Sequence, residues 1–385
     1  MKALIVGGVG MVGQAVARSL LSQEVVKKIT LGDIVTDESR LHEKLRASDK
    51  VSLIRIDVND HEALVQAMKD VDVVVNCAGP FYRTGPAVAK AAIEAKVNYV
   101  DICDDYEVIN FLFTPELDEA AKKAGVTILT GMGSDPGTNN LIAKYFADKL
   151  DRVDEIALYW VIGLADLGER ATWGAAWDHS LYMNLGNVPQ YLDGKIEYVP
   201  AGSGDEMVEF PEPLGTCRLR YVGHPQPLTI PRYIKGVRTV TIKGGFLPAW
   251  VDELIKEQKE QGFLSLEPVE VKGVKVVPYD LTRVLWRKIP ENRDRGPVAS
   301  GLKVVVKGER EGKRVTYSCE MVGRTAPGTG IPASIGALML YSGEVKVKGV
   351  VPPEGCIDAE KFVEAFLKRG AKIHLTETIT SLMGS

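Results

Sequence analysis

Three side chains in this sequence combine a type and a position that suit proton transfer. Asp104 and Asp135 each follow a short apolar segment that we predict to be a strand, and His179 lies two residues after Trp177. Carboxylates and imidazoles donate or accept protons in reactions when their surroundings bring the pKa close to the working pH. We therefore take these three residues as candidate catalytic acids or bases.

Each candidate also has a purely structural interpretation. Asp135 precedes a Pro-Gly pair and could be a turn residue, whereas Asp104 could be a solvated loop acid beside a second aspartate. His179 could be a packed side chain rather than a reactive one. His224 lies in a Gly-His-Pro turn and has the same two interpretations.

The other reactive residue types are expected to be structural. His42, His61 and His374 occupy polar segments that predict surface positions, and Cys103 is expected to be a buried neutral thiol. The five cysteines are scattered and form no CxxC pair, so we expect no disulfide framework and assign no metal ligand. The motifs HExxH, GxSxG and GxxxxGK[ST] do not occur, which leaves metalloprotease, serine hydrolase and P-loop functions without support.

A glycine-rich turn follows the first predicted strand. Gly8, Gly10 and Gly13 fit the pattern GxGxxG, and Met11 and Val12 open the helix that follows. In this pattern the first glycine permits a tight turn, the second leaves room for a pyrophosphate, and the third lets the helix approach the strand. The free N–H groups at the helix N-terminus then face the pyrophosphate. The motif indicates a dinucleotide cofactor.

An acid at the end of the next strand indicates which dinucleotide. Asp33 follows the glycines by about twenty residues, where a carboxylate binds the ribose hydroxyls and repels the 2′-phosphate of NADP. No arginine occurs among the residues directly after it, so we predict NAD, with NADP as the less favoured cofactor. Asp57 ends the third predicted strand and could contact the adenine or simply cap the strand. Ala78, Gly79 and Pro80 end the fourth, where the nicotinamide half must pass.

The elements that must position these residues alternate regularly over the first third of the chain. Strands are predicted at Lys2–Val6, Ile29–Leu31, Val51–Ile56, Asp72–Asn76, Asn98–Ile102 and Val126–Thr130. Helices are predicted at Met11–Leu21, His61–Lys69, Gly85–Ala95 and Thr114–Ala124. This alternation predicts an α/β fold with a doubly wound parallel sheet of the Rossmann type, whose carboxyl edge binds ligands.

Beyond Gly133 the pattern changes to a mixed one. Helices are predicted at Asn139–Leu150, within Leu247–Gly262, at Ile331–Leu340 and at Asp358–Arg369. Strands are predicted at Glu155–Ile162, Leu302–Val306 and Arg314–Val322, the last two as an antiparallel pair. We interpret this region as a second, mixed α/β domain.

Composition and charge narrow the range of partners. The 385 residues carry a net charge of −4 with no block of like charge, so we expect neither a nucleic-acid partner nor a membrane surface. No apolar run reaches the roughly 18 residues that a membrane-spanning helix needs. The N-terminus lacks the pattern of a signal peptide. We expect a cytoplasmic protein.

Several motifs follow one another in an order that resembles the saccharopine dehydrogenase-like family, which includes the lysine 6-dehydrogenases. They are GGVGMVG at 7–13, NCAGPF at 76–81, YVDICDD at 99–105, GMGSDPGTNN at 131–140, YWVIGL at 159–164 and TGIPASIGALML at 329–340. The resemblance implies a Rossmann domain at 1–138, an inserted substrate and dimerisation domain at 139–328, and C-terminal helices at 329–385 that return to the Rossmann domain. It also implies which residues border the nicotinamide, namely Asn76, Ala78, Gly79, Pro80 and Phe81.

The resemblance implies chemistry at a C–N bond. Family members oxidise an amine of an amino acid to an imine or reduce an imine to an amine, and they are commonly dimers. We therefore expect an NAD-dependent oxidoreductase that acts on a small basic amino acid and forms a homodimer. Asp104, Asp135 or His179 would handle the proton of the substrate nitrogen, and Arg232, Arg238 or Arg324 would hold its carboxylate.

Three functions stay open at this point. The first hypothesis is L-lysine 6-dehydrogenase, which needs a pocket for one small amine. The second is a saccharopine- or carboxynorspermidine-type imine reductase, which needs a longer cleft in which arginines hold carboxylates. The third belongs to another class, a regulator that binds NAD without turnover.

Overall fold

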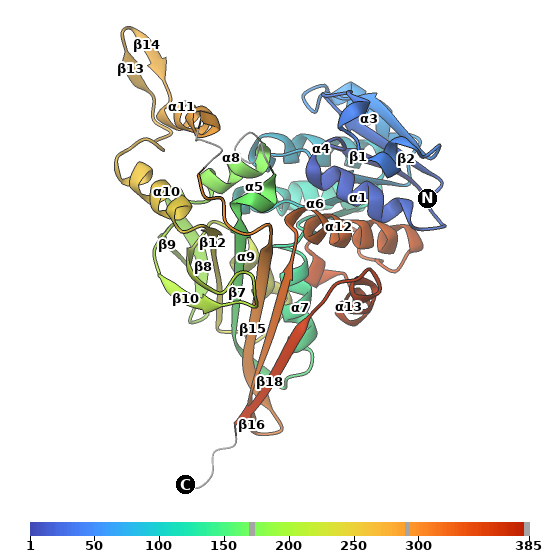
Figure 1. Ribbon diagram of the computed structural model, residues 1–385. Coiled ribbons are helices and arrows are strands. Elements are labelled where there is room, and N and C mark those ends of the chain that lie inside the picture. Colours follow the sequence, from blue (N-terminus) through green and yellow to red (C-terminus); the bar gives the residue numbers. More distant parts are fainter. Residues whose placement is uncertain (169–173, 289–292, 381–385) are drawn as a thin grey trace.

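The computed structural model describes residues 1–168, 174–288 and 293–380, and these form two sheets with helices around and between them (Figure 1). The first sheet has seven strands in the order β17-β6-β5-β4-β1-β2-β3, and every pair is parallel. Its strands are β1 (Lys2–Val6), β2 (Lys28–Asp33), β3 (Val51–Arg55), β4 (Val73–Asn76), β5 (Asn98–Asp101), β6 (Thr127–Leu129) and β17 (Gly349–Val351). The prediction of a doubly wound Rossmann sheet is confirmed.

Helices cover both faces of this sheet, which explains why its strands are apolar throughout. Along β1, Ile5 packs with the cluster under α1 (Met11–Leu21) and α12 (Thr325–Ser342), whereas Leu4 packs under α3 (His61–Met68) and α4 (Phe81–Ala95). Removing such side chains from water stabilises the fold by about 1.5–3 kcal/mol each. The remaining helices of the unit are α2 (Glu43–Arg46), α5 (Tyr106–Leu112) and α6 (Pro115–Ala124).

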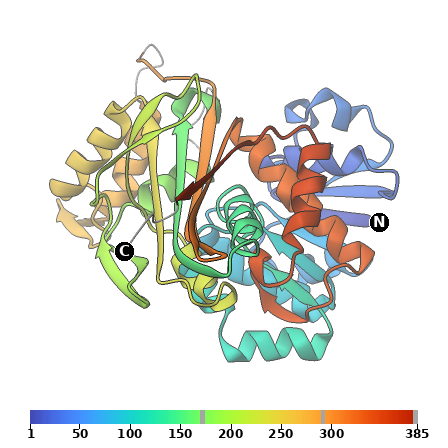
Figure 2. The ribbon, with the colours of Figure 1, turned by 90° about the horizontal axis from the view of Figure 1, so that it is seen from below.

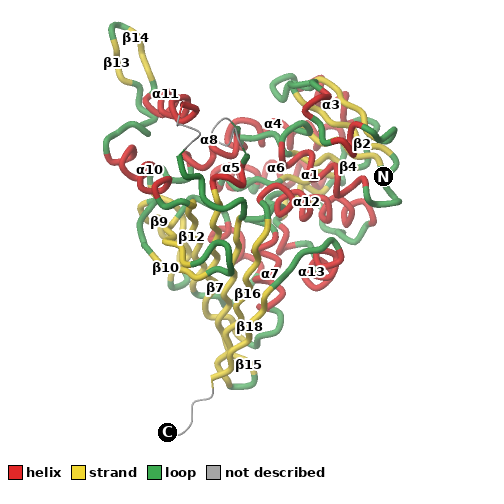
Figure 3. The backbone as a smooth tube through the Cα atoms, viewed as in Figure 1, coloured by secondary structure: helices red, strands yellow, loops and turns green. Residues whose placement is uncertain are grey.

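The second sheet is mixed and has nine strands. Its main path runs β10-β11-β12-β7-β15-β16-β18, with β8 pairing with β12 and β9 with β8; only β7 and β12 are parallel neighbours. The bounds are β7 (Arg152–Gly163), β8 (Asn187–Leu192), β9 (Lys195–Pro200), β10 (Glu206–Glu209), β11 (Thr216–Tyr221), β12 (Thr239–Leu247), β15 (Ser300–Arg310), β16 (Lys313–Gly323) and β18 (His374–Thr380). The long strands β7, β15, β16 and β18 run together toward the C-terminal end (Figure 3).

Several helices connect or flank this second sheet. They are α7 (Thr138–Ala147), α8 (Ala175–Tyr182), α9 (Gln226–Tyr233), α10 (Trp250–Glu260), α11 (Pro278–Leu285) and α13 (Ala359–Lys368). A small hairpin of β13 (Val269–Val271) and β14 (Val274–Val276) projects away from the rest of the molecule (Figure 1). In the described parts of the chain, every helix is too short or too polar to cross a membrane.

The C-terminal part of the chain differs from the prediction in one respect. We predicted that residues 329–385 return to the Rossmann domain as helices, and α12 does pack on α1 while β17 extends the first sheet. Figure 2 shows these orange-red elements against the blue N-terminal unit. The prediction is wrong for β18, which pairs with β16 in the second sheet. The unpaired edge of a long hairpin strand offers backbone hydrogen bonds that helical periodicity does not reveal.

Candidate active site

The glycine-rich turn sits between β1 and α1, but its glycines divide the work differently from our prediction. Gly7, not Gly8, makes the tight turn, because Gly7 has a φ of 77° whereas Gly8 is not in the left-handed region. A Cβ on Gly13 would lie 2.3 Å from the Gly7 carbonyl oxygen. A Cβ on Gly8 would lie 2.8 Å from the Leu31 Cβ, so Gly8 serves packing against β2. The backbone geometry therefore assigns the turn and the close helix approach to Gly7 and Gly13, with Gly10 between them as the N-cap of α1.

The sequence contained the signal for this spacing. Gly7 and Gly8 are adjacent, so the residues alone allow two spacings, GxGxxG from Gly8 and GxxGxxG from Gly7. Because β1 ends at Val6, the first residue that must turn is Gly7. Gly10 is the N-cap of α1, and the first turn of this helix carries no acidic residue. The free N–H groups there fit the pyrophosphate of a dinucleotide.

Asp33 ends β2 and holds the loop that would carry the cofactor. Its Oδ2 accepts a hydrogen bond from the N–H of Val9 (3.0 Å), and its Oδ1 accepts one from the N–H of Val35 (3.1 Å). The expectation that no arginine lies nearby is wrong. In the parallel register of β2 and β3, Arg55 is the partner of Asp33, and its Nη1 donates to the Ile34 carbonyl (2.8 Å). An arginine from the next strand is invisible in a window along the chain.

Other predicted cofactor residues have structural roles at the strand ends. Asp57 is exposed and accepts hydrogen bonds from the backbone N–H and side chain of Asn59, both at 2.9 Å. Asn76 is fully buried; its Nδ2 donates to the Tyr99 hydroxyl (3.0 Å) and its Oδ1 accepts from the N–H of Ala78 (3.0 Å). The side chain of Asn76 therefore fixes the backbone of the turn that follows β4.

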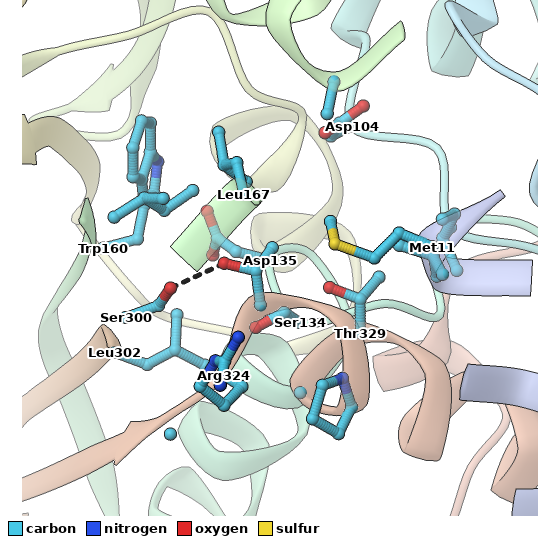
Figure 4. Close-up of a pocket in the computed structure, with 18 of the residues that line it drawn as sticks. Met11, Asp104, Ser134, Asp135, Trp160, Leu167, Ser300, Leu302, Arg324 and Thr329 are labelled. Carbon is cyan, nitrogen blue, oxygen red and sulfur yellow. Dashed lines mark hydrogen bonds between the residues drawn. The ribbon is translucent and has the colours of Figure 1, made fainter. Parts of the chain in front are cut away.

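A cavity of about 1110 Å³ opens at the carboxyl edge of the Rossmann sheet and extends to the second sheet. The predicted cofactor residues that line it are Gly10, Met11, Val12, Gly13, Gly79, Pro80 and Phe81. Those outside its lining are Gly8, Asp33, Asp57, Asn76 and Ala78. In the view of Figure 4, Met11 and Trp160 lie on opposite sides of the cavity, with Asp135 between them.

All three predicted catalytic residues line this cavity, although they come from different elements. His179 lies on α8, which begins at Ala175, and its Nδ1 lies 2.7 Å from Oδ1 of Asp105. The other oxygen of Asp105 accepts a hydrogen bond from the N–H of Tyr82 (2.9 Å), so this buried carboxylate is anchored. The Nε2 of His179 lies 3.3 Å from Oδ2 of Asp104. The imidazole is thus held between two carboxylates.

The three neighbouring groups His179, Asp104 and Asp105 influence one another's protonation. Burial by itself lowers the pKa of His179, but the carboxylates of Asp104 and Asp105 outweigh that effect and raise the pKa to about 9. Burial raises the pKa of Asp104, the positive charge of His179 opposes the rise, and Asp105 adds to it. His179 is therefore protonated at neutral pH and can donate a proton to a group in the cavity.

Asp135 is held by two amide side chains and lies beside a second histidine. Its Oδ1 accepts hydrogen bonds from Nδ2 of Asn139 and Nε2 of Gln226, both at 2.6 Å, and its Oδ2 lies 3.0 Å from Nδ1 of His224. The rings of His179 and His224 have centroids 5.6 Å apart. The structure therefore joins Asp104, Asp135 and His179 into one cluster and adds His224 to it.

Two members of this cluster were missed or left open in the sequence. Asp105 was noted only as the neighbour of Asp104, yet it is the residue that is 1% exposed and fixes His179. The pair of adjacent aspartates at 104–105 in YVDICDD was the sequence feature that could have indicated a role for Asp105. His224 carried no local signal beyond its turn, because it reaches the cluster only through the folding of the second sheet.

One of the three candidate arginines lines the cavity. Arg324 precedes α12, and its Nε donates to Oδ1 of the buried Asp166. Asp166 also accepts from the hydroxyl of Ser300 (2.5 Å) and the N–H of Thr325 (2.6 Å), so it fixes the arginine firmly. The other two lie elsewhere: Arg238 pairs with an exposed aspartate, and the Arg232 guanidinium stacks on a phenylalanine ring at 5.0 Å.

The cysteine and the three histidines that we expected to be structural lie away from the cavity. Cys103 is fully buried, and burial, reinforced by Asp101, raises the pKa of its thiol well above the ordinary value. His61 is exposed and paired with Glu94, and His374 is also exposed, whereas His42 is half-buried and its Nδ1 accepts a hydrogen bond from the N–H of Lys44. None of these four side chains lines the described cavity.

Comparison with known protein families covers nearly the whole chain. The saccharopine dehydrogenase NADP binding domain family matches residues 3–129, and the saccharopine dehydrogenase C-terminal domain family matches residues 133–373. The second match alone spans more than half of the chain.

Individual relatives and structures agree with this match. The chain is 23% identical to a carboxynorspermidine synthase of Vibrio alginolyticus in an alignment of 406 positions that covers 96% of each protein. It is 23% identical over 398 residues to a carboxyaminopropylagmatine dehydrogenase of Synechocystis sp., covering 97% of each. Its fold is similar to that of a saccharopine dehydrogenase (L-Glu forming) from Saccharomyces cerevisiae, with a TM-score of 0.69, 18% identity and coverage of 99% and 100%.

Proposed function

The chain belongs to the saccharopine dehydrogenase family and is an NAD(P)-dependent oxidoreductase of that type, and we propose that it reduces an imine formed between an amine and a carboxylate-bearing aldehyde. This reverses the order of our two hypotheses from the sequence. The relatives matched over their full length are named for polyamine derivatives that carry a carboxyl group, not for lysine.

The observation that carries the proposal is the presence of two opposite charge environments in one cavity. Asp104, Asp135 and His179 form an acidic and protonatable cluster, whereas Arg324 presents a guanidinium fixed by Asp166. An amine or imine nitrogen suits the first environment and a carboxylate suits the second, because arginine binds carboxylates through its forked donors. Arg40, Arg369 and Lys372 line the same cavity and add positive charge.

The residues of the cluster would manage the protons of the reaction. An amine and an aldehyde condense to an imine with loss of water, and the imine becomes a secondary amine by gaining one hydride on carbon and one proton on nitrogen. The hydride would come from NAD(P)H, when this cofactor is bound at the N-terminus of α1. His179 would hold the proton for the nitrogen, Asp105 would keep the imidazole oriented, and Asp104 would stabilise the positive imine.

For the cofactor we propose a preference for NAD. The carboxylate of Asp33 stands at the end of β2, where ribose hydroxyls are bound and a 2′-phosphate is repelled. Arg55 lies close enough on β3 to moderate that repulsion, so some use of NADPH is expected.

The testing experiment measures oxidation of NADH by the purified full-length chain with a panel of diamines and short ω-oxo acids. We expect oxidation only when an amine and an aldehyde are both present, with a secondary amine as product. A parallel assay supplies NAD and L-lysine alone. Release of ammonia there would instead support lysine 6-dehydrogenase, and tight NAD binding without turnover in either assay would support a regulator.

A further inference from the structure

Three side chains at the cavity wall offer ligand atoms of the kinds that bind a transition metal. Asp104, His179 and His224 each contribute one such atom, and the three atoms lie within 4.8 Å of one another. The residues come from separate parts of the chain, so spacing along the sequence gave no hint of the cluster. His179 and His224 are 8% and 4% exposed, so neither is a surface histidine.

Each of the two imidazoles has a carboxylate beside its Nδ1 atom. Oδ1 of Asp105 is hydrogen-bonded to Nδ1 of His179 at 2.7 Å, whereas Oδ2 of Asp135 lies 3.0 Å from Nδ1 of His224 without a hydrogen bond between them. The Nε2 of His179 is buried and makes no hydrogen bond within the described chain, although Asp104 lies 3.3 Å away. In metal sites a carboxylate commonly engages the second ring nitrogen of a histidine ligand and fixes its tautomer, as Asp105 does for His179.

The donor set selects the class of ion. Two imidazole nitrogens and one carboxylate oxygen suit Zn²⁺, which keeps a fourth position open at sites with three protein ligands. Mg²⁺ and Ca²⁺ prefer oxygen ligands throughout, so two histidines argue against them. The open position would face the cavity, since all three residues line it.

We propose that Asp104, His179 and His224 bind one Zn²⁺ ion, with Asp105 as the carboxylate that supports His179. The ion would occupy the place assigned above to the substrate nitrogen. Bound zinc would therefore compete with the amine, a consequence that rests on the proposed function, whereas binding of the ion does not.

The test titrates Zn²⁺ into the full chain, freed of metal by chelation, in competition with a chromophoric chelator. We expect one equivalent to bind and Co²⁺ to give the visible absorption of a low-symmetry site. His224→Gln and Asp104→Asn should each abolish the competition. Asp105→Asn, which removes only a supporting carboxylate, should weaken binding about 10- to 100-fold.

The matched control is His61→Gln, because His61 is exposed, is paired with Glu94 and does not line the cavity. It should leave Zn²⁺ binding unchanged, and circular dichroism establishes that each variant is folded. Failure of the unaltered chain to compete with the chelator, or an equal loss in His61→Gln, would overturn the metal site. Zinc binding in a protein that shows no turnover would support the site while contradicting the proposed reaction.

Discussion

At the residue scale, three reactive groups of the site are fixed by buried partners. Asp105 holds His179, Asp166 holds Arg324, and Asn139 and Gln226 hold Asp135. Such hydrogen bonds to charged groups contribute about 1.5–3 kcal/mol each. The supporting residues therefore decide the protonation and direction of the side chains that face the cavity.

Arg324→Lys is expected to lower kcat/KM about 10- to 100-fold for substrates that carry a carboxylate, because lysine keeps the charge but loses the forked donors. Steady-state kinetics with paired aldehydes, one with and one without the carboxylate, measure the effect. The aldehyde without a carboxylate is the control and should show little change. An equal loss for both would mean that Arg324 acts only through the fold.

Asp33→Ser is expected to lower kcat/KM for NADH about tenfold and to raise it for NADPH, because the ribose loses a charged acceptor while the 2′-phosphate loses a repelling charge. Kinetics with both cofactors provide the measurement. Asp57→Asn serves as the comparison, and it should change the ratio far less, since Asp57 caps a turn at Asn59. If Asp57→Asn changed the ratio of kcat/KM for NADH to that for NADPH more than Asp33→Ser, the result would support a contact between Asp57 and the adenine.

The rate of imine reduction is expected to stay high up to about pH 9 and to fall above it. The pKa of His179 is raised to about 9, so the imidazolium that supplies the proton is lost only above that value. Asp105→Asn removes a charge that raises this pKa, and the alkaline limb should move to lower pH. A pH profile of kcat for both proteins measures it, and an unmoved limb would assign the proton to another group.

At the element scale, the crossing of α1 and α12 ties the start of the Rossmann unit to the C-terminal part of the chain. The hydroxyls of Ser19 and Ser334 lie 2.6 Å apart across it. A Cβ on Gly330 would lie 2.7 Å from the Cβ of Ala15, so only glycine allows this approach. Because the N-terminus of α1 lines the cavity, the crossing also positions the proposed cofactor site.

Gly330→Ala is expected to lower the free energy of unfolding by about 1–3 kcal/mol, the usual cost of overpacking a close contact. Denaturant titration followed by circular dichroism measures it. Gly328→Ala on the same helix is the control, since its Cβ would meet nothing closer than the Ser134 hydroxyl at 3.8 Å. It should be neutral or stabilising by roughly 0.5–1 kcal/mol because alanine favours helix. Equal losses would refute the packing argument.

At the scale of the whole molecule, the projecting hairpin is a feature that a single copy leaves unexplained. Val269, Val271 and Val274 on β13 and β14 are about half exposed or more, as are Leu281 and Leu285 on α11. A two-stranded hairpin is marginal by itself, and clustered exposed apolar residues mark interaction surfaces. The homodimer that the family resemblance implies stays a prediction, and this arm is where we expect the second copy.

Light scattering of the purified chain should give the mass of a dimer. Replacing Val269, Val271 and Val274 with threonine keeps their shape, adds hydroxyls and should shift the mass toward that of the 42.0 kDa monomer. The variant should keep the circular dichroism of the original chain. A monomeric mass for the unaltered chain would contradict the dimer. A dimeric mass for the variant would place the interface elsewhere.

Much of the molecule followed from the sequence because its signals are local. The Rossmann unit was predictable from apolar strands, helical periodicity and a glycine turn, all within one stretch of chain. Asp104, Asp135 and His179 were likewise chosen from their positions after predicted strands or beside aromatic residues, and the fold brings them into one cavity. The family resemblance rested on the order of such local motifs.

Only the tertiary structure decided what depends on contacts between distant segments. Parallel pairing of β2 and β3 places Arg55 beside Asp33, the fold of the second sheet brings His224 to Asp135, and burial of Asp166 selects Arg324. The pairing of β18 with β16 has the same origin. Periodicity reports which face of an element is buried but not which other element covers it. The identity of a neighbour is set by packing and by strand register.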